Sequence, residues 1–319
     1  MNKPKLSVCL ITYRHEAFIV QALEGIFKQI VNFEVEIVIG EDKSPDRTLA
    51  LIEEHIPNSP FKVKLLENKT NLGMIGNWLN TMANCEGEYI ALIEGDDYWT
   101  DVHKLQKQVE LLDSQPKLSF CFHGCPMQFE REDNQEQYFH KPPQEGIYHL
   151  KDVLHKTSFV PTCSVVLRRA MLSTFPEQIK SLKMIDKFLF LSLADKGDLY
   201  YIAQDMGVYR IHNGGISQTQ WLGNANRFQE DSIALLKLFN TFTKHRHDEA
   251  VNFEIVKTYE LLIKNNQHDA VFYKKQLKAL FRYRPFKNRG VLKNYIITDI
   301  LPKPIYRAYS KFKKGLRRR

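Results

Sequence analysis

The first hundred residues alternate between short apolar runs and segments with helical periodicity, and this alternation limits the possible folds most strongly. The apolar runs are rich in β-branched residues, which is typical of buried strands. The runs are Leu6–Ile11, Val35–Ile39, Val63–Leu66 and Tyr89–Ile93, and the helical segments between them are residues 18–27, 47–55 and 74–83. Such an alternation predicts an α/β fold in which a parallel sheet carries helices on both faces.

Polar side chains follow three of these predicted strands. The first strand ends at Thr12-Tyr13, the second at Glu41-Asp42 and the fourth at Glu94-Gly95-Asp96-Asp97. Parallel sheets place ligands just beyond the carboxyl ends of their strands, so we expect these side chains to line one crevice. Carboxylates there could hold a divalent cation together with phosphate oxygens, and an aromatic ring and an acid could bind a nucleobase. The alternative is a polar turn whose acids only cap the next helix, predicted for residues 101–114.

No Gly-x-Gly-x-x-Gly or Walker sequence follows any of these strands, which excludes the usual dinucleotide and P-loop sites. The chain instead resembles a family-2 glycosyltransferase with the GT-A fold. The resemblance covers about residues 5–215 and includes the strands and strand ends already named. The other matching segments are Asn71-Leu72-Gly73, Thr162–Arg169, Met184-Ile185-Asp186 and Tyr209-Arg210-Ile211-His212. The resemblance implies a Rossmann-like, mixed and mostly parallel sheet.

The resemblance also implies a role for each matching polar residue. Tyr13 would stack on the base of a nucleotide sugar, and Asp42 would bind that base. The donor-binding set that it implies is Thr12, Tyr13, Glu16, Asp42, Asn71, Gly73 and Asp96, with Asp96 near the ribose. Asp97 would be the metal ligand of the family's Asp-x-Asp motif. Glu94 stands where that motif usually has its first Asp and keeps the charge, but its role stays open.

Two residues in the second half of the matching region carry further chemistry. Asp186 opens a predicted helix, where an aspartate could serve only as a cap. The resemblance instead implies a general base that deprotonates an acceptor hydroxyl. His212 precedes Gly214-Gly215, and it is either a structural hydrogen-bonding residue or, as the resemblance implies, a metal ligand near the donor diphosphate. Arg168-Arg169, after a strand predicted for Cys163–Leu167, are interpreted as the solvated start of a helix.

The charge of the chain is unevenly distributed. Residues 271–319 contain 16 Lys and Arg and one acid, whereas residues 1–270 contain 29 Lys and Arg against 36 Asp and Glu. The last residues place an apolar stripe opposite a basic one at helical spacing, which predicts a helix lying on an anionic membrane surface. The apolar stripe is Ile305, Tyr309, Phe312 and Leu316, and the basic side is Arg307, Lys311, Lys314 and Arg318. The alternative is a solvated tail, or one that packs its stripe on the protein body.

Length and composition complete the expected organisation. We expect a catalytic GT-A domain over residues 1–220, a helical region over 221–284 and a basic amphipathic tail over 285–319. Helical periodicity in the second region covers residues 228–242, 250–264 and 270–283. The five cysteines lack metal-ligand spacing, so we expect reduced, buried thiols. Without a signal peptide or a membrane-spanning apolar window in the sequence, we expect a cytoplasmic protein, peripheral on the inner face of the cell membrane.

Together with these features, the resemblance implies an inverting glycosyltransferase that depends on Mn²⁺ or Mg²⁺. It would move a sugar from a nucleotide sugar, most simply a UDP-sugar, to a polysaccharide or a lipid-linked oligosaccharide. Two other functions stay open at this point. One is a nucleotide-sugar-binding scaffold that has lost catalysis, although intact Asp97 and Asp186 speak against it. The other is a nucleic-acid-binding protein, suggested by Phe281-Arg282-Tyr283-Arg284 and the basic tail; the acidic body argues against nucleic acid as a partner.

Overall fold

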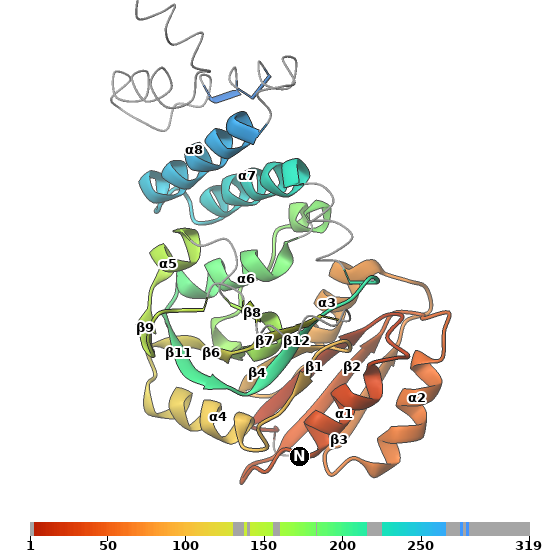
Figure 1. Cartoon of the computed structure of the whole chain (residues 1–319). Helices are drawn as coiled ribbons and strands as arrows, with labels where there is room; N and C mark the ends of the chain where they lie inside the picture. Colours follow the sequence, from red (N-terminus) through yellow and green to blue (C-terminus); the bar gives the residue numbers. More distant parts are fainter. Residues whose placement is uncertain are drawn as a thin grey trace, which may run out of the picture. The chain divides into compact units, whose positions relative to one another are not determined.

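The chain folds into two units, Met1–Gln220 and Trp221–Arg319, and each is described by itself. Figure 1 shows their helices and strands in the order of the chain. The structure is a computed structural model, and it describes residues 3–129, 137–138, 141–155, 160–182, 184–215, 225–265, 275–276 and 279–280.

An eight-stranded sheet organises the first unit, with the strand order β3-β2-β1-β4-β10-β6-β11-β9. Its N-terminal half consists of β1 (Leu6–Thr12), β2 (Val35–Glu41), β3 (Lys62–Glu67) and β4 (Tyr89–Glu94). Neighbours among these four strands all pair in parallel, as the alternation of strands and helices predicted. The register sets Thr12 beside Glu41 and Ile11 beside Glu94, so the polar ends of β1, β2 and β4 meet at one edge.

Helices cover both faces of this half of the sheet (Figure 1). They are α1 (Ile19–Phe27), α2 (Thr48–His55), α3 (Gly73–Ala83) and α4 (Lys104–Ser114). Buried side chains of α1, α2 and α4 form one core cluster with Leu6, Val8 and Leu10 of β1. α3 packs on the opposite face, where a Cβ added to Gly40 of β2 would overlap the Thr81 hydroxyl. Burial on both faces explains why these strands are nearly continuous apolar runs.

The C-terminal half of the sheet mixes parallel and antiparallel pairs. β10 runs antiparallel between β4 and β6, β11 pairs with β6 in parallel, and β9 adds an antiparallel edge. The bounds are β6 (Leu118–Gly124), β9 (Gly146–Tyr148), β10 (Val166–Arg168), β11 (Asp198–Asp205), α5 (Leu150–His155) and α6 (Ile185–Ala194). Short 3₁₀ helices occupy Ile56–Asn58, Thr162–Ser164, Arg169–Met171 and Glu177–Ser181. The predicted mixed α/β sheet is therefore confirmed.

The segment around Arg168 differs from the prediction. The strand expected for Cys163–Leu167 begins as a 3₁₀ helix and becomes β10 only at Val166. Arg168 ends that strand, and its guanidinium donates hydrogen bonds to the Leu112 and Leu118 carbonyls and to the Tyr89 hydroxyl. Arg169 likewise donates to the Gly87 carbonyl. A short 3₁₀ helix does begin at Arg169, but the expectation that the two arginines are solvated was wrong, because both guanidinium groups donate hydrogen bonds to acceptors at the end of the sheet.

A small four-stranded sheet, β5-β12-β7-β8, positions the chain after residue 206. Its strands are β5 (Tyr98–Trp99), β7 (Pro126–Phe129), β8 (Gln137–Tyr138) and β12 (Gly207–Ile211). β12 pairs antiparallel with β5, with Gly207 beside Trp99. Because β5 directly follows the acidic turn after β4, this pairing brings His212 within reach of Asp96, 116 residues away in the sequence.

The second unit contains α7 (Ala225–Phe242) and α8 (Asp248–Asn265), which pack against each other. They agree with the helical periodicity of residues 228–242 and 250–264. The helix expected for 270–283 lies outside the described residues apart from 275–276 and 279–280, and the tail over 285–319 lies wholly outside them. Among the helices in the described ranges, none has the length and apolar character needed to cross a membrane.

Candidate active site

Backbone hydrogen bonds continue beyond the strands and hold three loops at one edge of the sheet. The Asp42 N–H donates to the Thr12 carbonyl at 3.1 Å, and the Gly95 N–H donates to the Ile11 carbonyl of β1 at 2.9 Å. The Asp97 N–H then donates to the Glu94 carbonyl at 3.1 Å, which closes a tight turn. Glycine is needed in this turn because a Cβ on Gly95 would lie 2.5 Å from Thr12 Oγ1. The polar strand ends therefore converge, as expected for parallel strands.

Hydrogen bonds join the loop after β1 to the loop after β2. Their hydrogen bonds include Arg14 N–H to Ser44 Oγ at 3.0 Å, His15 N–H to Thr48 Oγ1 at 2.9 Å and Arg47 N–H to Glu16 Oε2 at 2.9 Å. Arg14 and Lys43 both adopt the left-handed conformation, with φ of 59° and 60°. Such strained residues persist only where their surroundings fix them. Glu16, a predicted donor residue, thus braces the two loops, while the neighbouring Tyr13 ring is 36% exposed.

A second loop junction surrounds Asp42, which is buried. Its Oδ1 accepts the Leu72 N–H at 2.7 Å and the Asn68 amide at 3.0 Å. The Asn71 amide donates to the Asp42 carbonyl at 2.8 Å, and Asn71 Oδ1 accepts the Gly73 N–H at 3.0 Å. Gly73 has a φ of +73°, which favours glycine. The structure thus brings Asp42, Asn71 and Gly73 together; sequence reasoning missed Asn68, for which no motif gave a signal.

The turn after β4 gathers Glu94, Asp96 and Asp97, whose carboxylate oxygens lie within 4.8 Å of one another. Asp97 is 1% exposed; its Oδ1 accepts the Arg210 N–H at 2.9 Å, and its Oδ2 has no hydrogen-bond partner among the described residues. Burial, and then the charges around it, raise the pKa of Asp97 well above its usual range. Burial and the charges of Asp96 and Asp186 raise the pKa of Glu94 to about 8. A bound cation would relieve this crowding.

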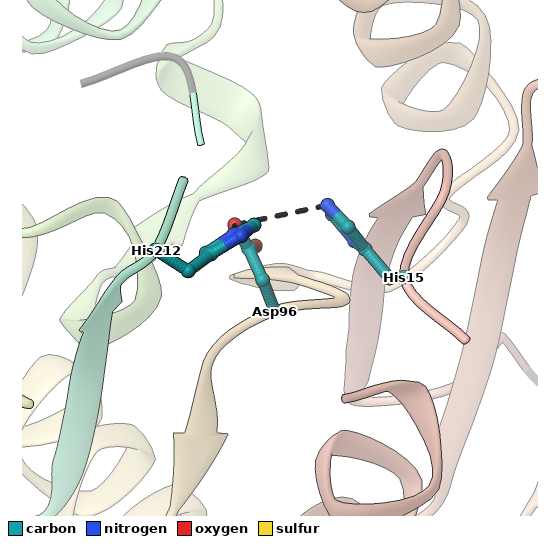
Figure 2. Close-up of side chains that lie close together, drawn as sticks. All are labelled: His15, Asp96 and His212. Atoms are coloured by element: carbon teal, nitrogen blue, oxygen red, sulfur yellow. Dashed lines mark hydrogen bonds and ion pairs between the residues drawn. The ribbon is translucent and has the colours of Figure 1, made fainter. Parts of the chain in front are cut away.

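Asp96 also belongs to a second cluster, with His15 and His212 (Figure 2). Asp96 Oδ2 lies 3.0 Å from His212 Nε2 and 3.7 Å from His15 Nε2. Burial works to raise the pKa of Asp96, but the two imidazoles outweigh it and lower that pKa. Burial lowers the pKa of His15, which favours the neutral ring. Sequence reasoning missed His15, and its only signal was its place in the loop that follows Thr12.

Arg210 holds the end of β12 against the acidic turn. Its Nη1 donates a hydrogen bond to the Asp96 carbonyl at 2.6 Å, and its Nη2 donates one to Gln21 Oε1. The guanidinium lies 4.5 Å from the centroid of the Tyr98 ring, a cation–π contact. The sequence singled Arg210 out only as part of a matching segment. In the structure it fixes the direction in which the chain reaches His212.

Asp186 lies in the first turn of α6. The N-cap residue of this helix is Met184, without a side-chain capping hydrogen bond, so Asp186 is not the cap itself. Burial raises the pKa of the Asp186 carboxyl. The charge of Asp186 contributes to the raised pKa of Glu94, so the two carboxyl groups lie within electrostatic range of each other.

Known proteins match this chain in sequence. The sequence model described as "Glycosyl transferase family 2" matches residues 7–175, more than half of the chain. An uncharacterized protein from Mycobacterium tuberculosis is 32% identical over 256 residues, which cover 78% of this chain and 72% of that protein. The poly(ribitol-phosphate) beta-N-acetylglucosaminyltransferase TarS from Staphylococcus aureus is 35% identical over 96 residues, covering 30% of this chain and 16% of TarS.

Solved structures share the fold. TarS 1–349 from S. aureus in complex with UDP-GlcNAc matches with a TM-score of 0.64 at 19% identity, covering 88% of this chain and 81% of that one. The mannosyltransferase PcManGT from Pyrobaculum calidifontis, in complex with GDP-Man and Mn²⁺, matches with a TM-score of 0.55 at 14% identity, covering 90% and 82%. At these identities the likeness confirms the predicted GT-A fold. The family match goes further: the chain belongs to glycosyl transferase family 2 and is a glycosyltransferase, as the sequence predicted.

Proposed function

We propose that this glycosyltransferase is metal-dependent and inverting, and that it transfers a sugar from a UDP-sugar to a polysaccharide or a lipid-linked oligosaccharide. The proposal is supported by two parts that meet at one edge of the sheet and by a third that acts on them electrostatically. The first two are the interlocked loops around Asp42 and the acidic turn after β4, and the third is Asp186 of α6, whose charge acts on Glu94 of that turn. They suit three separate tasks: binding the donor, holding a cation at its diphosphate and activating the acceptor.

The donor nucleoside would lie against the loops after β1 and β2. The half-exposed Tyr13 ring offers a surface for stacking on the base. Asp42 Oδ1 accepts hydrogen bonds from the Asn68 amide and the Leu72 N–H, and the other carboxylate oxygen would accept a base N–H. Thr12, Asn71 and Gly73 would complete this part of the donor site, with Asp96 near the ribose or the diphosphate. A UDP-sugar is supported by the solved complex of TarS with UDP-GlcNAc.

A divalent cation, Mn²⁺ or Mg²⁺, fits the residues of the acidic turn. The buried Asp97 Oδ2 lacks a partner among the described residues, and further carboxylates lie beside it. Uncompensated buried charges are costly, so a cation would stabilise this arrangement. Asp96, Asp97 and His212 are the candidate ligands. When bound, such a cation offsets the charge that develops on a leaving diphosphate. The Mn²⁺ in the PcManGT complex supports an ion of this kind.

Asp186 would take the proton of the acceptor hydroxyl. A sugar hydroxyl is a weak nucleophile, and a carboxylate within hydrogen-bond reach activates it as the new bond forms. The raised pKa of Asp186, caused by burial, makes its carboxylate a better proton acceptor. A single displacement at the anomeric carbon would invert its configuration. A polymeric acceptor is supported by the name of TarS, which acts on poly(ribitol-phosphate).

The basic tail would dock the enzyme on the anionic inner face of the cell membrane, near a lipid-linked acceptor. This part of the proposal is supported by sequence alone, because residues 285–319 lie outside the described ranges. Each Lys or Arg close to an anionic surface contributes about 1 kcal/mol, so several would hold a helix of modest apolar area.

The test of the catalytic role is Asp186→Asn. A screen of UDP-sugars with Mn²⁺ by thermal shift identifies a donor, and its slow hydrolysis, with water in place of the acceptor, then reports turnover. Asp186→Asn should keep donor-induced stabilisation but lose on the order of 10²–10⁴ in hydrolysis rate. Asp195→Asn, at the other end of α6, is the matched control and should turn over at the wild-type rate. Near wild-type hydrolysis by Asp186→Asn would contradict the assignment.

A further inference from the structure

We propose that His15 is a metal ligand together with Asp96 and His212, so that the cation site has two imidazoles and one carboxylate and selects Mn²⁺ or Co²⁺ over Mg²⁺ and Ca²⁺. The inference rests on the metal dependence proposed above and makes it specific. Figure 2 shows the arrangement: His15, from the loop after β1, and His212, after β12, both point at the Asp96 carboxylate. Three separate segments of the chain thus supply one side chain each.

The spacing of the three side chains suits a single ion. Asp96 Oδ2 lies 3.0 Å from His212 Nε2 and 3.7 Å from His15 Nε2, and all three ligand atoms lie within 4.8 Å of one another. Two ligand atoms at right angles around an ion, each about 2.1 Å from it, are about 3 Å apart. Small rotations of the imidazoles would therefore close the set on one face of an ion. The other positions of an octahedral ion would stay open for diphosphate oxygens and water.

The surroundings of His15 orient its Nε2 toward Asp96. His15 Nδ1 lies 3.2 Å from Thr12 Oγ1, so a proton on Nδ1 is satisfied and Nε2 is left as the free donor atom for a metal. Outer hydrogen bonds of this kind commonly fix metal-binding histidines. The His15 N–H is held by Thr48 Oγ1, and a Cβ on Gly95 would lie 2.9 Å from the His15 ring. The glycine of the acidic turn therefore makes room for this imidazole.

The His212 ring is enclosed in a similar way. Its centroid lies 4.6 Å from that of the Phe18 ring, and a Cβ on either Gly214 or Gly215 would come within 3.4 Å of the imidazole. The chain after His212 therefore passes within van der Waals contact of its own imidazole. Phe18 also lies beside His15, with ring centroids 6.5 Å apart. One apolar ring therefore supports both imidazoles.

The acidic cluster of Glu94, Asp96 and Asp97 is the competing set of ligands, and Asp97 fits it less well. Asp97 is 1% exposed, and its Oδ1 already accepts the backbone N–H of Arg210. That bond ties the turn to β12 and so sets the position of His212, which directly follows this strand. Of the candidate ligands named above, we therefore assign Asp97 to positioning His212 rather than to the ion, although its buried Oδ2 has no hydrogen-bond partner among the described residues, and Asp96 as the carboxylate ligand that both clusters share.

The identity of the ligands predicts the preference for metals. Mg²⁺ and Ca²⁺ favour oxygen ligands, whereas imidazole nitrogens favour transition metals. Two nitrogens and one oxygen should therefore bind Mn²⁺ and Co²⁺ more tightly than Mg²⁺. The acidic cluster, with oxygen ligands alone, would give a weaker preference between Mn²⁺ and Mg²⁺.

The experiment titrates Mn²⁺ into the full-length protein with UDP present and follows the free Mn²⁺ by electron paramagnetic resonance. His15→Gln should raise the dissociation constant for Mn²⁺ about ten-fold or more. His103→Asn, an exposed histidine at the start of α4, is the matched control and should bind as the wild type does. His15→Asp restores a ligand of a different kind: it should bind Mn²⁺ again but with a preference shifted toward Mg²⁺, which a purely structural role of His15 would not produce.

Electron spin echo envelope modulation of the bound Mn²⁺ gives a second readout, because it detects coupling to imidazole nitrogens. The wild type should show two such nitrogens and His15→Gln one. Asp97→Asn should retain nitrogen coupling, since the side-chain amide of that variant still offers an oxygen to the Arg210 N–H. Unchanged affinity and coupling in His15→Gln would overturn the His15 assignment and leave the metal dependence intact. Absence of Mn²⁺ binding by the wild type would overturn both.

Discussion

Lys104, the first residue of α4, is fully buried, and replacing it by methionine should stabilise the protein. Its Nζ has no hydrogen-bond partner in the described part of the chain and lies 4.0 Å from the centroid of the Trp99 ring. Burial lowers the pKa of Lys104 from 10.5 to about 7, although the thiols of Cys121, Cys163 and Cys125 act in the opposite direction. An ammonium group at the N-terminus of a helix is also unfavourable in itself.

The sign and size of the effect follow from linkage. Between pH 7 and 10.5 the unfolded Lys104 binds a proton that the folded one does not, so stability rises with pH in this window. Below it, burying the charge costs at most about 5 kcal/mol, at about 1.4 kcal/mol per pKa unit. Loss of the cation–π contact with Trp99 offsets about 1–2 kcal/mol of any gain. Lys104→Met should therefore gain at most about 3–4 kcal/mol at pH 6, and the gain should shrink as the pH rises.

Urea denaturation followed by tryptophan fluorescence measures this difference, because Trp99 lies directly against Lys104. Wild type, Lys104→Met and the exposed control Lys117→Met are compared at pH 6, 8 and 9. We expect the advantage of Lys104→Met to fall by about 1.4 kcal/mol per pH unit above pH 7, and Lys117→Met to show no such trend. A Lys104→Met protein that is less stable than the wild type at pH 6, or an advantage independent of pH, would refute the reasoning.

Two further predictions concern the packing of the sheet and the tail. Gly40→Ala should lower the free energy of unfolding by about 1–3 kcal/mol, because the new methyl group would overlap the Thr81 hydroxyl. Adding Thr81→Ala should recover part of that loss in urea denaturation, and a double variant no more stable than Gly40→Ala would contradict the packing argument. Truncation after Leu301 should release the protein from vesicles of anionic lipid at moderate salt, because each basic residue removed from the surface takes away about 1 kcal/mol of binding free energy. Donor hydrolysis should continue unchanged. Equal vesicle binding by both chains would show that the tail does not dock.

The parallel half of the fold could be predicted because its signals are local. Each of β1 to β4 is a short apolar run, and each connecting helix has its own periodicity, so the order of elements follows from the sequence alone. The convergence of Thr12, Glu41 and Glu94 then follows from the rule that parallel strands end at one edge. The family resemblance added what the patterns could not, the expected roles of Asp42 and Asp186.

The mixed half of the fold depends on contacts between distant segments. Arg168 was expected in solvent because nothing in the sequence near two consecutive arginines indicates their hydrogen-bond acceptors. One acceptor of the Arg168 guanidinium, the Tyr89 hydroxyl, is 79 residues away. β12 makes two short pairings, with β5 and with β7, that no periodicity reveals. His15 was missed for the same reason. Only its closeness to Asp96 makes it a candidate ligand, and Asp96 lies far along the chain in the turn after β4.

The clearest limit of the sequence concerns the two adjacent acids, Asp96 and Asp97. Both follow the same apolar strand, and only the family resemblance told them apart, by implying Asp97 as the metal ligand and Asp96 near the ribose. In the structure the turn directs them to different surroundings, because successive side chains leave the chain in different directions. Asp97 turns inward to the Arg210 N–H, whereas Asp96 turns to His15 and His212. The proposed choice of Asp96 as the metal ligand therefore rests on β12, because the Arg210 N–H of this strand bonds to Asp97 and the strand leads directly to His212, which lies against Asp96.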